Sequence, residues 1–259
     1  MSKLLMLGLG LAVAGCIGCG GNTKTVEVEL PVEKVVYIEV PVEIKKQGSI
    51  VLTFDDGVCV NSWVDNKELF HKYEAKATFF VSHYSNNDFK DKLLTLQDEG
   101  FEIAHHSTYH HNAVTFSEEN GIDKWLEIEV DHTLDMMTDD GLNIDTFAFP
   151  YGAFNDGLVE SLRGRFSKVR GYLSPKTDNL RLGTQTDGFF YGGIGIDTHM
   201  LTDDIYAGMD RAKDNGLDLV VAAHCIELDG SWHIKTDELE SIMDYAHQID
   251  LQFKMFKEL

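Results

Sequence analysis

The sequence predicts an α/β fold built on a parallel sheet, and three observations support this. From Gly48 onward, short apolar runs alternate with amphipathic stretches, as strands and helices alternate along a parallel sheet. Chemically reactive side chains follow directly after several of these runs, where the sites of parallel α/β folds form. The 259 residues, 43% of them hydrophobic, suffice for one large domain with its own core.

Five apolar runs are continuous and rich in β-branched or aromatic residues, as expected of strands buried on both faces. These runs lie at 49–54, 77–81, 101–104, 146–149 and 217–222. The amphipathic stretches between them have helical periodicity. These stretches lie near 64–74, 88–99, 117–137, 155–165, 202–215 and 236–248.

Residues 1–15 have the pattern of a signal peptide. Lys3 precedes an apolar run to Gly15 that is too short to remain as a membrane span. The run ends in Val-Ala-Gly followed by Cys16, which resembles the lipobox of bacterial lipoproteins. That resemblance implies export, cleavage before Cys16 and anchoring to a bacterial membrane of the cell envelope through lipid on this cysteine. An ordinary secretory signal is the alternative.

Residues 16–47 are expected to form an extended tether. Val28–Glu33 recurs as Ile38–Glu43, a ten-residue internal repeat in which Val and Glu alternate around proline. This composition disfavours a helix and suits a spacer, although the alternation also allows strands that pair. Either form leaves residues 48–259 as the catalytic domain.

The formal net charge is −21, and five Lys balance five Glu in the first 47 residues. The whole imbalance therefore falls on residues 48–259. Because that field repels nucleic acid, no nucleic-acid partner is expected, whereas a neutral or cationic substrate is compatible with it.

Asp56, His106 and His110 form the candidate metal site. Two imidazoles and one carboxylate suit zinc or a similar divalent ion and leave positions open for water and substrate. The four-residue spacing of His106 and His110 would place both rings on one side of a helical turn. His105 and His111 flank them, so different pairings such as His105 with His110 stay open.

Asp55 and His224 are the candidate proton-transfer groups. Asp55 directly precedes Asp56, so one carboxylate can bind metal while the other takes a proton from water. His224 follows the last apolar run and can protonate a leaving amine. The competing interpretations are an ordinary Asp-Asp-Gly turn and a structural histidine.

Four motifs resemble those of the polysaccharide deacetylase family. They are Thr53-Phe54-Asp55-Asp56-Gly57, His106-Ser107-Thr108-Tyr109-His110, Phe149-Pro150-Tyr151-Gly152 and Leu219-Val220-Val221-Ala222-Ala223-His224. The resemblance implies a distorted (β/α) barrel with fewer than eight regular repeats. It also implies removal of N-acetyl groups from a cell-wall polysaccharide or exopolysaccharide that contains N-acetylhexosamine.

The resemblance assigns a role to each site residue. Asp55 is the base and His224 the acid, and Asp56, His106 and His110 hold a divalent metal. The metal expected first is Zn²⁺, with Co²⁺, Ni²⁺ or Mn²⁺ also possible. The Tyr151 backbone N–H helps to hold the oxyanion. Asp197 matches the carboxylate that orients the acid. Trp232 and His233, in a polar loop after His224, are candidates for the substrate cleft.

One position departs from the family. The third motif usually carries an arginine that supports the base, and this chain has Ala148 there. The departure predicts a slower or differently selective enzyme and lends support to a non-catalytic glycan-binding envelope lipoprotein. An O-acetyl esterase and a small-amide hydrolase are further functions that the same family allows. Cys59 and Cys225 follow the first and last catalytic strands, where free buried thiols are expected and a disulfide is the alternative.

Overall fold

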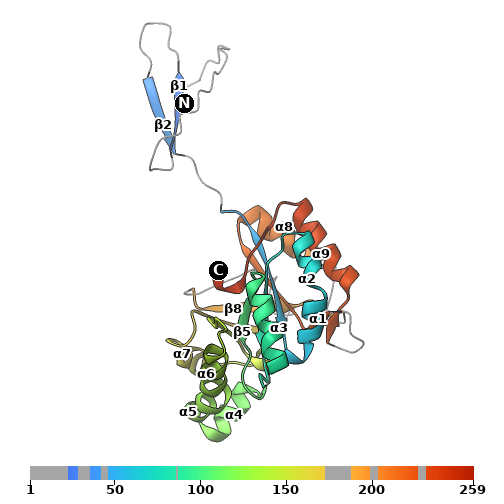
Figure 1. The fold of residues 1–259 in the computed structure, drawn as a ribbon. Coiled ribbons are helices and arrows are strands. Elements are labelled where there is room, and N and C mark those ends of the chain that lie inside the picture. Colours follow the sequence, from blue (N-terminus) through green and yellow to red (C-terminus); the bar gives the residue numbers. More distant parts are fainter. Residues whose placement is uncertain are drawn as a thin grey trace. The chain divides into compact units, whose positions relative to one another are not determined.

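The computed structural model describes residues 23–28, 36–41, 46–85, 87–172, 188–198, 204–226 and 232–259 (Figure 1). The chain divides into two units, Met1–Lys46 and Gln47–Leu259. The predicted signal peptide and Cys16 lie outside the described residues.

The N-terminal unit contains a pair of strands. β1 (Thr23–Val28) runs antiparallel to β2 (Val36–Pro41), with Thr23 opposite Pro41 and Val28 opposite Val36. The alternation of Val and Glu is thus realised in these residues as strand pairing, the second of the two forms that the pattern allowed. Its role as a spacer stays a prediction.

The second unit is a distorted (β/α) barrel of seven parallel strands. The strand order is β3-β4-β5-β6-β7-β8-β9, and β9 pairs with β3 to close the ring. A short eighth strand, β12, adds to the beginning of β3. The barrel strands are β3 (Ser49–Asp55), β4 (Ala77–Val81), β5 (Glu102–His105), β6 (Thr146–Ala148), β7 (Lys168–Tyr172), β8 (Phe190–Gly195) and β9 (Asp218–Ala223). The remaining strands are β10 (Cys225–Ile226), β11 (His233–Ile234) and β12 (Gln252–Phe253).

The five predicted strands are confirmed as β3, β4, β5, β6 and β9, within one or two residues at their ends. Two barrel strands, β7 and β8, were missed. β7 reads Lys-Val-Arg-Gly-Tyr and β8 reads Phe-Tyr-Gly-Gly-Ile-Gly. Charge and glycine weaken the strand signal in both, and only their partners in the ring hold them extended.

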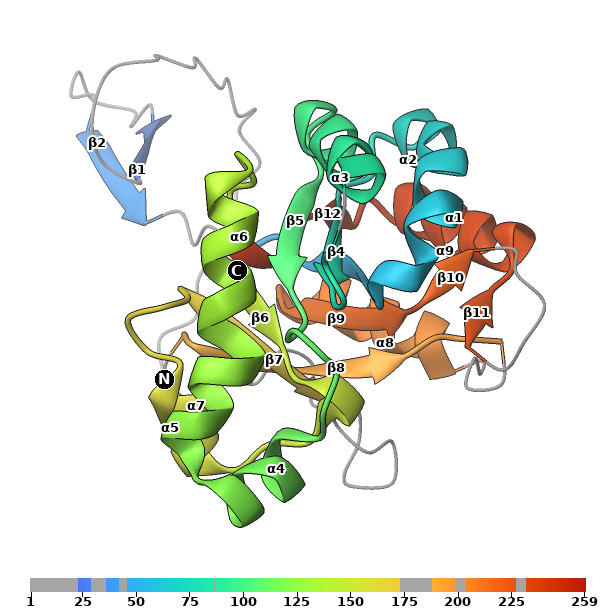
Figure 2. The same ribbon diagram turned by 60° about the horizontal axis from the view of Figure 1, so that its bottom comes forward.

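Helices cover the outside of the barrel. In Figure 2, α1, α2, α3 and α9 lie on one side of the strands, and α5, α6 and α7 lie on the other. The predicted helix at 117–137 is in fact α4, α5, a π-helical turn η2 and α6, divided at Gly121. The helices are α1 (Val60–Asp65), α2 (Lys67–Lys72), α3 (Asn87–Asp98), α4 (Ala113–Asn120), α5 (Ile122–Trp125), η2 (Leu126–Asp131), α6 (His132–Asp139), α7 (Asp156–Ser161), α8 (Asp204–Asn215) and α9 (Thr236–Gln248). Short 3-10 turns are η1 (Gly57–Cys59), η3 (Pro150–Gly152) and η4 (Phe256–Glu258).

The barrel interior is closed at the end where its strands begin. Phe256 of η4 is fully buried against Phe80 and Tyr191. Buried Glu102 accepts hydrogen bonds from Thr78 and Thr146 of the neighbouring strands and from the Lys257 backbone N–H. The strand ends that are followed by the candidate site residues therefore lie at the opposite end of the barrel.

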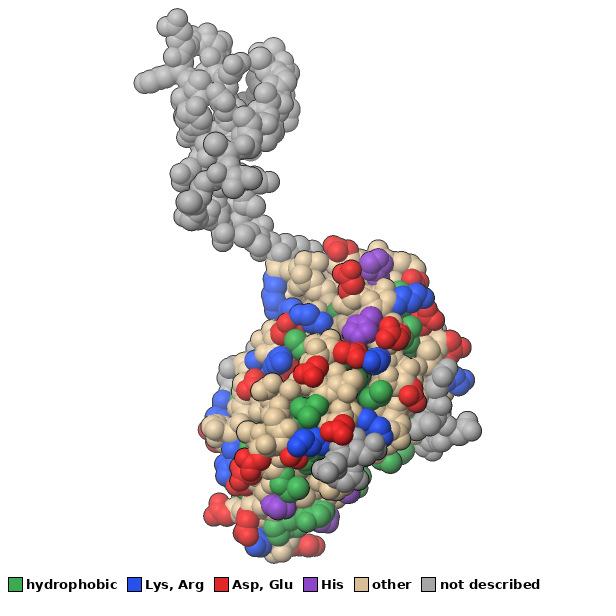
Figure 3. Space-filling model, viewed as in Figure 1, with side chains coloured by type: hydrophobic (Ala, Val, Ile, Leu, Met, Phe, Trp, Pro, Cys, Tyr) green, Lys and Arg blue, Asp and Glu red, His purple; other side chains and the backbone are tan. Residues whose placement is uncertain are grey.

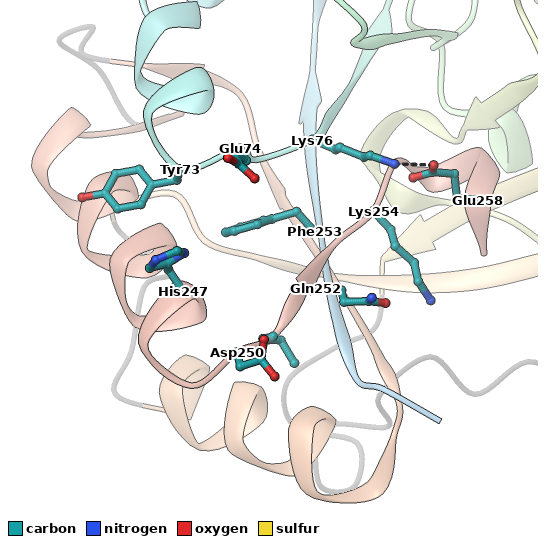
Figure 4. A pocket seen from close by; sticks show the side chains of 10 residues that line it. Tyr73, Glu74, Lys76, His247, Asp250, Gln252, Phe253, Lys254 and Glu258 are labelled. Atoms are coloured by element: carbon teal, nitrogen blue, oxygen red, sulfur yellow. Dashed lines mark hydrogen bonds and ion pairs between the residues drawn. The ribbon is translucent and has the colours of Figure 1, made fainter. Parts of the chain in front are cut away.

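A hollow of about 450 Å³ lies where β3, β4 and β12 begin (Figure 4). It is lined by side chains of mixed charge, and Lys76 pairs with Glu258 across its edge. None of the residues that the sequence singled out lines this hollow.

The surface carries interspersed acidic and basic side chains (Figure 3). Hydrophobic and histidine side chains gather on this face at the end where α4 lies in Figure 1. In the described part of the chain, every helix is too short or too polar to cross a membrane.

Candidate metal centre and proton-transfer groups

The parallel ring brings the sequence motifs to one place. Because all barrel strands run in the same direction, the loops that follow β3, β5, β6 and β9 meet at one end. Asp55 ends β3 and His105 ends β5, while Tyr151 lies in η3 after β6 and His224 follows β9.

Asp56, His106 and His110 form a compact cluster whose ligand atoms all lie within 4.8 Å of one another. Asp56 Oδ1 lies 3.0 Å from His110 Nε2 and 3.6 Å from His106 Nε2. A tetrahedral ion with bonds of about 2.1 Å holds its ligand atoms about 3.4 Å apart. The donor set and its spacing therefore fit a divalent ion such as zinc, and among the described residues no other cluster of this kind is present.

The His106 ring is oriented by a backbone acceptor. Its Nδ1–H donates to the Ala148 carbonyl oxygen at 2.8 Å, which leaves the Nε2 lone pair facing Asp56. Burial lowers the pKa of His106 to about 4, so the ring is neutral near pH 7, as a metal ligand must be. Burial raises the pKa of Asp56, but the hydrogen bond to His110 and the neighbouring imidazoles more than offset this, so its pKa lies below the usual range.

The expected helical turn at His106–His110 is wrong, because these residues form a loop. Ser107 and His110 have φ of 64° and 59°, in the left-handed region that non-glycine residues rarely adopt. The Ser107 hydroxyl accepts the His110 backbone N–H at 3.0 Å. This local bond bends the loop so that both imidazoles face Asp56 without helical geometry.

Glu129 of η2 holds the same loop from outside. Its side chain is fully buried and accepts the Tyr109 backbone N–H at 3.0 Å and the His111 ring N–H at 2.5 Å. Its backbone carbonyl accepts the Thr108 N–H at 2.9 Å. Sequence reasoning missed Glu129, because nothing in a polar helical stretch marks one glutamate as buried. The π-helical turn that carries it is a feature common at functional sites.

His105 is excluded as a ligand. Its ring is buried against Phe147 and Phe166, and its Nδ1 accepts the Ser107 backbone N–H. Burial lowers the pKa of His105 to about 3. Of the pairings that the sequence left open, the structure therefore realises His106 with His110.

Asp55 lies beside the cluster and is fully buried. Arg170 Nη2 donates to its Oδ2 at 2.5 Å, and the Tyr172 hydroxyl donates to the same oxygen at 3.4 Å. Burial raises the pKa of Asp55, but the charge of Arg170 and then those of His106 and His224 more than offset this, so its pKa lies below the usual range. Asp55 Oδ1 has no hydrogen-bond partner among the described residues, so it is free to accept a proton.

His224 lies close to Asp56 as well. Its Nε2 is 4.0 Å from Asp56 Oδ2, and its Nδ1–H donates to Asp197 Oδ2 at 2.8 Å. Asp197 is fully buried and also accepts the His224 backbone N–H at 3.1 Å. Burial lowers the pKa of His224. The hydrogen bond to Asp197 and the negative charges of Asp55, Asp197 and Asp56 raise it by more, so the pKa lies above the usual value.

A sequence model of the polysaccharide deacetylase family matches residues 43–164, which hold the first three motifs and all three candidate metal ligands. Residues 43–164 therefore belong to the polysaccharide deacetylase family. Their relatives include the deacetylases and esterases of carbohydrate esterase family 4. No curated protein matches the sequence.

Solved structures of the family share the fold. Peptidoglycan deacetylase PdaC from Bacillus subtilis is 19% identical, with a TM-score of 0.51 over 83% of this chain and 90% of that one. A family 4 carbohydrate esterase from Streptomyces lividans in complex with acetate is 18% identical, with a TM-score of 0.54 over 80% and 92%. A mutant of a family pseudoenzyme with restored enzymatic activity is 16% identical, with a TM-score of 0.55 over 89% and 79%.

Arg170 occupies the place beside the base that Ala148 leaves open. In the register of β6 and β7, Ala148 lies directly opposite Arg170. Ala148 packs in the barrel interior, where Arg170 reaches Asp55. On the other side, a Cβ on Gly193 would come within 3.1 Å of the Arg170 side chain, so glycine makes room for it. Sequence reasoning missed Arg170 because it lies in the unpredicted strand β7.

The mouth of the site is lined by exposed rings. Tyr151 is 67% exposed, with its ring centroid 4.8 Å from that of His110. Trp232 is 57% exposed, with its ring centroid 5.1 Å from that of His224. His233 lies in β11 and is partly buried, and its carbonyl accepts the Thr198 N–H at 2.8 Å. The structure thus brings Tyr151 to the candidate ligand His110 and Trp232 to the candidate acid His224, whereas the contact of His233 with Thr198 supports the strand end that carries Asp197.

Cys59 and Cys225 form a disulfide with a Cα–Cα distance of 4.8 Å. The expectation of free thiols is therefore wrong. Both residues follow strands, β3 and β9, that pair directly in the closed ring. Closure of the barrel, which no local pattern encodes, brings the two cysteines together.

Proposed function

We propose that this family member is a metal-dependent hydrolase that removes N-acetyl groups from a polysaccharide containing N-acetylhexosamine. One observation carries the proposal. Asp56, His106 and His110 converge beside two buried pairs that can transfer protons, the Asp55–Arg170 pair and the His224–Asp197 pair. Hydrolysis of an amide needs this combination, because water must lose a proton and the leaving nitrogen must gain one.

Each residue has a distinct task in this reaction. Asp56, His106 and His110 would hold a divalent ion, which would lower the pKa of water and polarise a carbonyl oxygen. Asp55, kept ionised by Arg170, accepts the proton of the attacking water. His224, with its pKa raised by Asp197, donates a proton from Nε2 to the departing amine. The Tyr151 backbone N–H, in the residue whose ring packs against His110, donates to the developing oxyanion.

The polymeric substrate is supported by the exposed rings at the mouth. Six large hydrophobic residues of the described part are exposed, and Val58, Tyr109, Tyr151 and Trp232 lie on the loops around the candidate ligands. Aromatic faces pack well on sugar rings, whereas sites for small molecules usually enclose the ligand.

The test is acetate release by protein reconstituted with Zn²⁺, Co²⁺, Ni²⁺ or Mn²⁺. We expect release from N-acetylglucosamine oligomers to exceed release from acetylxylan and from small amides. A preference for acetylxylan would identify an O-acetyl esterase, and a preference for small amides would identify a small-amide hydrolase. Reconstituted protein that binds no metal and releases no acetate from any of the three would be a binding protein.

Arg170 argues against a non-catalytic role. The absence of arginine at position 148 was the sequence feature that favoured a binding protein. A fully buried ion pair between Arg170 and Asp55 is costly to bury, and its positive charge keeps the candidate base ionised. Its retention at the base therefore supports catalysis.

We also propose that the protein is exported and anchored through lipid on Cys16. The disulfide between Cys59 and Cys225 supports export, because such bonds persist in oxidising compartments. Cys16→Ala should move the protein from the membrane fraction to the soluble fraction, and retention in the membrane would contradict lipid anchoring.

A further inference from the structure

Three links join the segment that follows the base, residues 57–63, to the strand end that carries the acid. The disulfide is one of them. Cys59 ends η1, three residues after Asp56, and Cys225 directly follows His224. The other two links come from the adjoining helix α1. Trp63 Nε1–H donates to the His224 carbonyl oxygen at 2.9 Å, and the Ser62 hydroxyl accepts the Ile226 N–H at 3.1 Å.

These links are rigid because their anchors are buried. Cys59 is 1% exposed, and Trp63 is fully buried with its ring stacked on Phe79 at 4.9 Å. The Ser62 hydroxyl also donates to the Cys59 carbonyl oxygen at 2.9 Å, so α1 and the cysteine move as one body. The backbone of His224 is thereby fixed to the segment that carries Asp55 and Asp56.

These links bear on the distance between the candidate acid, His224, and the candidate metal ligand Asp56. Asp197 sets the direction of the His224 ring, since it binds both Nδ1 and the backbone N–H. The distance from Nε2 to Asp56 also depends on where the backbone of His224 lies relative to the segment that carries Asp56. The present separation is 4.0 Å to Asp56 Oδ2, and displacement of a catalytic group by about 1 Å can cost 100-fold in rate.

We propose that the Cys59–Cys225 disulfide, with Ser62 and Trp63, forms a clamp that positions His224 for proton donation to the leaving amine. These are positioning residues, because they act on the acid through its backbone. Cys59 also donates its backbone N–H to the Asp56 carbonyl oxygen at 3.0 Å, a bond that Cys59→Ala keeps. The inference rests on the proposed function. It predicts a selective defect: steps that need the acid slow down, while metal binding is retained because the three ligands are held by other contacts.

The test compares two acetyl substrates in the full-length protein. An N-acetylglucosamine oligomer has an amine leaving group that requires protonation, whereas p-nitrophenyl acetate has one that departs unprotonated. In Cys59→Ala/Cys225→Ala, kcat for the amide should fall roughly 10- to 100-fold, while kcat for the ester should change less than about threefold. Metal content should stay at the wild-type value. Equal losses on both substrates, or no loss, would overturn the proposal.

Two further variants keep the test decisive if the cysteine variant folds poorly. Ser62→Ala retains the disulfide and removes the two hydrogen bonds of the hydroxyl, to Cys59 and to Ile226, so it should give a smaller loss that is again confined to the amide. In a His224→Ala background, removal of the cysteines should cost no more than about twofold further, because the acid they position is gone. An additive loss in that background would show a general structural role.

A crystal structure of the cysteine variant separates this inference from the proposed function. We expect the distance from His224 Nε2 to Asp56 Oδ2 to exceed the 4.0 Å of the native chain. An unchanged distance would overturn the clamp even in an active enzyme. A widened distance in a chain whose native form releases no acetate would instead overturn the proposed function and leave the clamp standing.

Discussion

The two halves of the site are held in different ways. The metal half, Asp56, His106 and His110, lies on short loops in which Asp56 and His110 both have positive φ. A Cβ on Gly57, next to Asp56, would lie 2.4 Å from the Ser82 carbonyl oxygen, so glycine is required there. The metal half therefore depends on unusual local backbone geometry, which its own contiguous motif residues create.

The proton-transfer half has ordinary backbone and unusual partners. Asp55 and His224 occupy strand ends with φ in the common range. Asp55 is paired with buried Arg170 in the middle of β7, and His224 with buried Asp197 just after β8. Asp55 is paired with Arg170 across 115 residues of chain, and His224 with Asp197 across 27. The comparison teaches that the motifs position the metal ligands, whereas the barrel positions the charges that tune the base and the acid.

Substitution of a metal ligand should have the largest effect. His106→Ala removes one of three ligands, so we expect loss of bound metal and of measurable turnover. Metal content by mass spectrometry and acetate release check this. His71→Ala, which removes an exposed histidine paired with Glu99, is the control and should retain both. Full metal occupancy in His106→Ala would contradict the assignment of His106 to the metal half.

Asp55→Asn should lose most of its turnover while keeping its metal. The amide cannot accept the proton of water, and loss of a general base costs roughly 100- to 10,000-fold in kcat. Metal content and kcat measured on the same preparation separate the halves. If turnover stays normal, Asp55 is not the base.

Arg170→Leu should affect both stability and pH dependence. It leaves the Asp55 charge buried without its partner, which costs about 3–5 kcal/mol in the free energy of unfolding. Without Arg170, burial dominates and raises the pKa of Asp55, so the ionised base is lost at a higher pH and the acid limb of kcat/KM moves upward.

Denaturant unfolding and a pH–rate profile measure these two effects of Arg170→Leu. Arg165→Leu, which breaks a partly exposed pair with Asp131, is the control and should cost about 1 kcal/mol or less. Ala148→Arg in the Arg170→Leu background should restore part of the activity if only the position of the charge matters. If the acid limb of kcat/KM does not move in Arg170→Leu, Arg170 does not control the pKa of Asp55.

Asp197→Asn should shift the alkaline limb. The ionised Asp197 raises the pKa of His224, so its removal lowers that pKa. A general acid works in its protonated form, which is then lost at a lower pH, and the alkaline limb of kcat/KM moves downward. We expect about a 10-fold loss above the new pKa with metal content unchanged. A loss of equal size at every pH would indicate a misplaced ring rather than a changed pKa.

Glu129→Gln should have the smallest effect of these substitutions. It acts on the metal half through the loop that carries His110, because Glu129 is not itself a candidate ligand. The amide oxygen can still accept one N–H, but the charge-assisted contacts with Tyr109 and His111 weaken. We expect metal affinity to fall by about 10-fold, as is usual for groups that support metal ligands. Competition with a chelator measures this. Glu127→Gln, on the exposed face of the same turn, is the matched control and should leave affinity unchanged.

Much of the fold was readable from the sequence because five of the seven barrel strands are continuous apolar runs. β7 and β8 were not, since charge and glycine obscure them and only pairing with their neighbours makes them strands. The N-terminal repeat, read as a spacer, contains paired strands because alternation of Val and Glu serves both forms equally.

By itself, the sequence determined the family, the barrel and the residues of the metal cluster. It could do so because short motifs encode loop geometry in adjacent residues, as in Asp55-Asp56-Gly57 and His106–His110. The tertiary structure decided that Arg170 supports the base, that Glu129 holds the histidine loop and that Cys59 meets Cys225. These contacts depend on strand register and on closure of the ring. Both arise from packing over the whole barrel, so no local stretch of the chain specifies them.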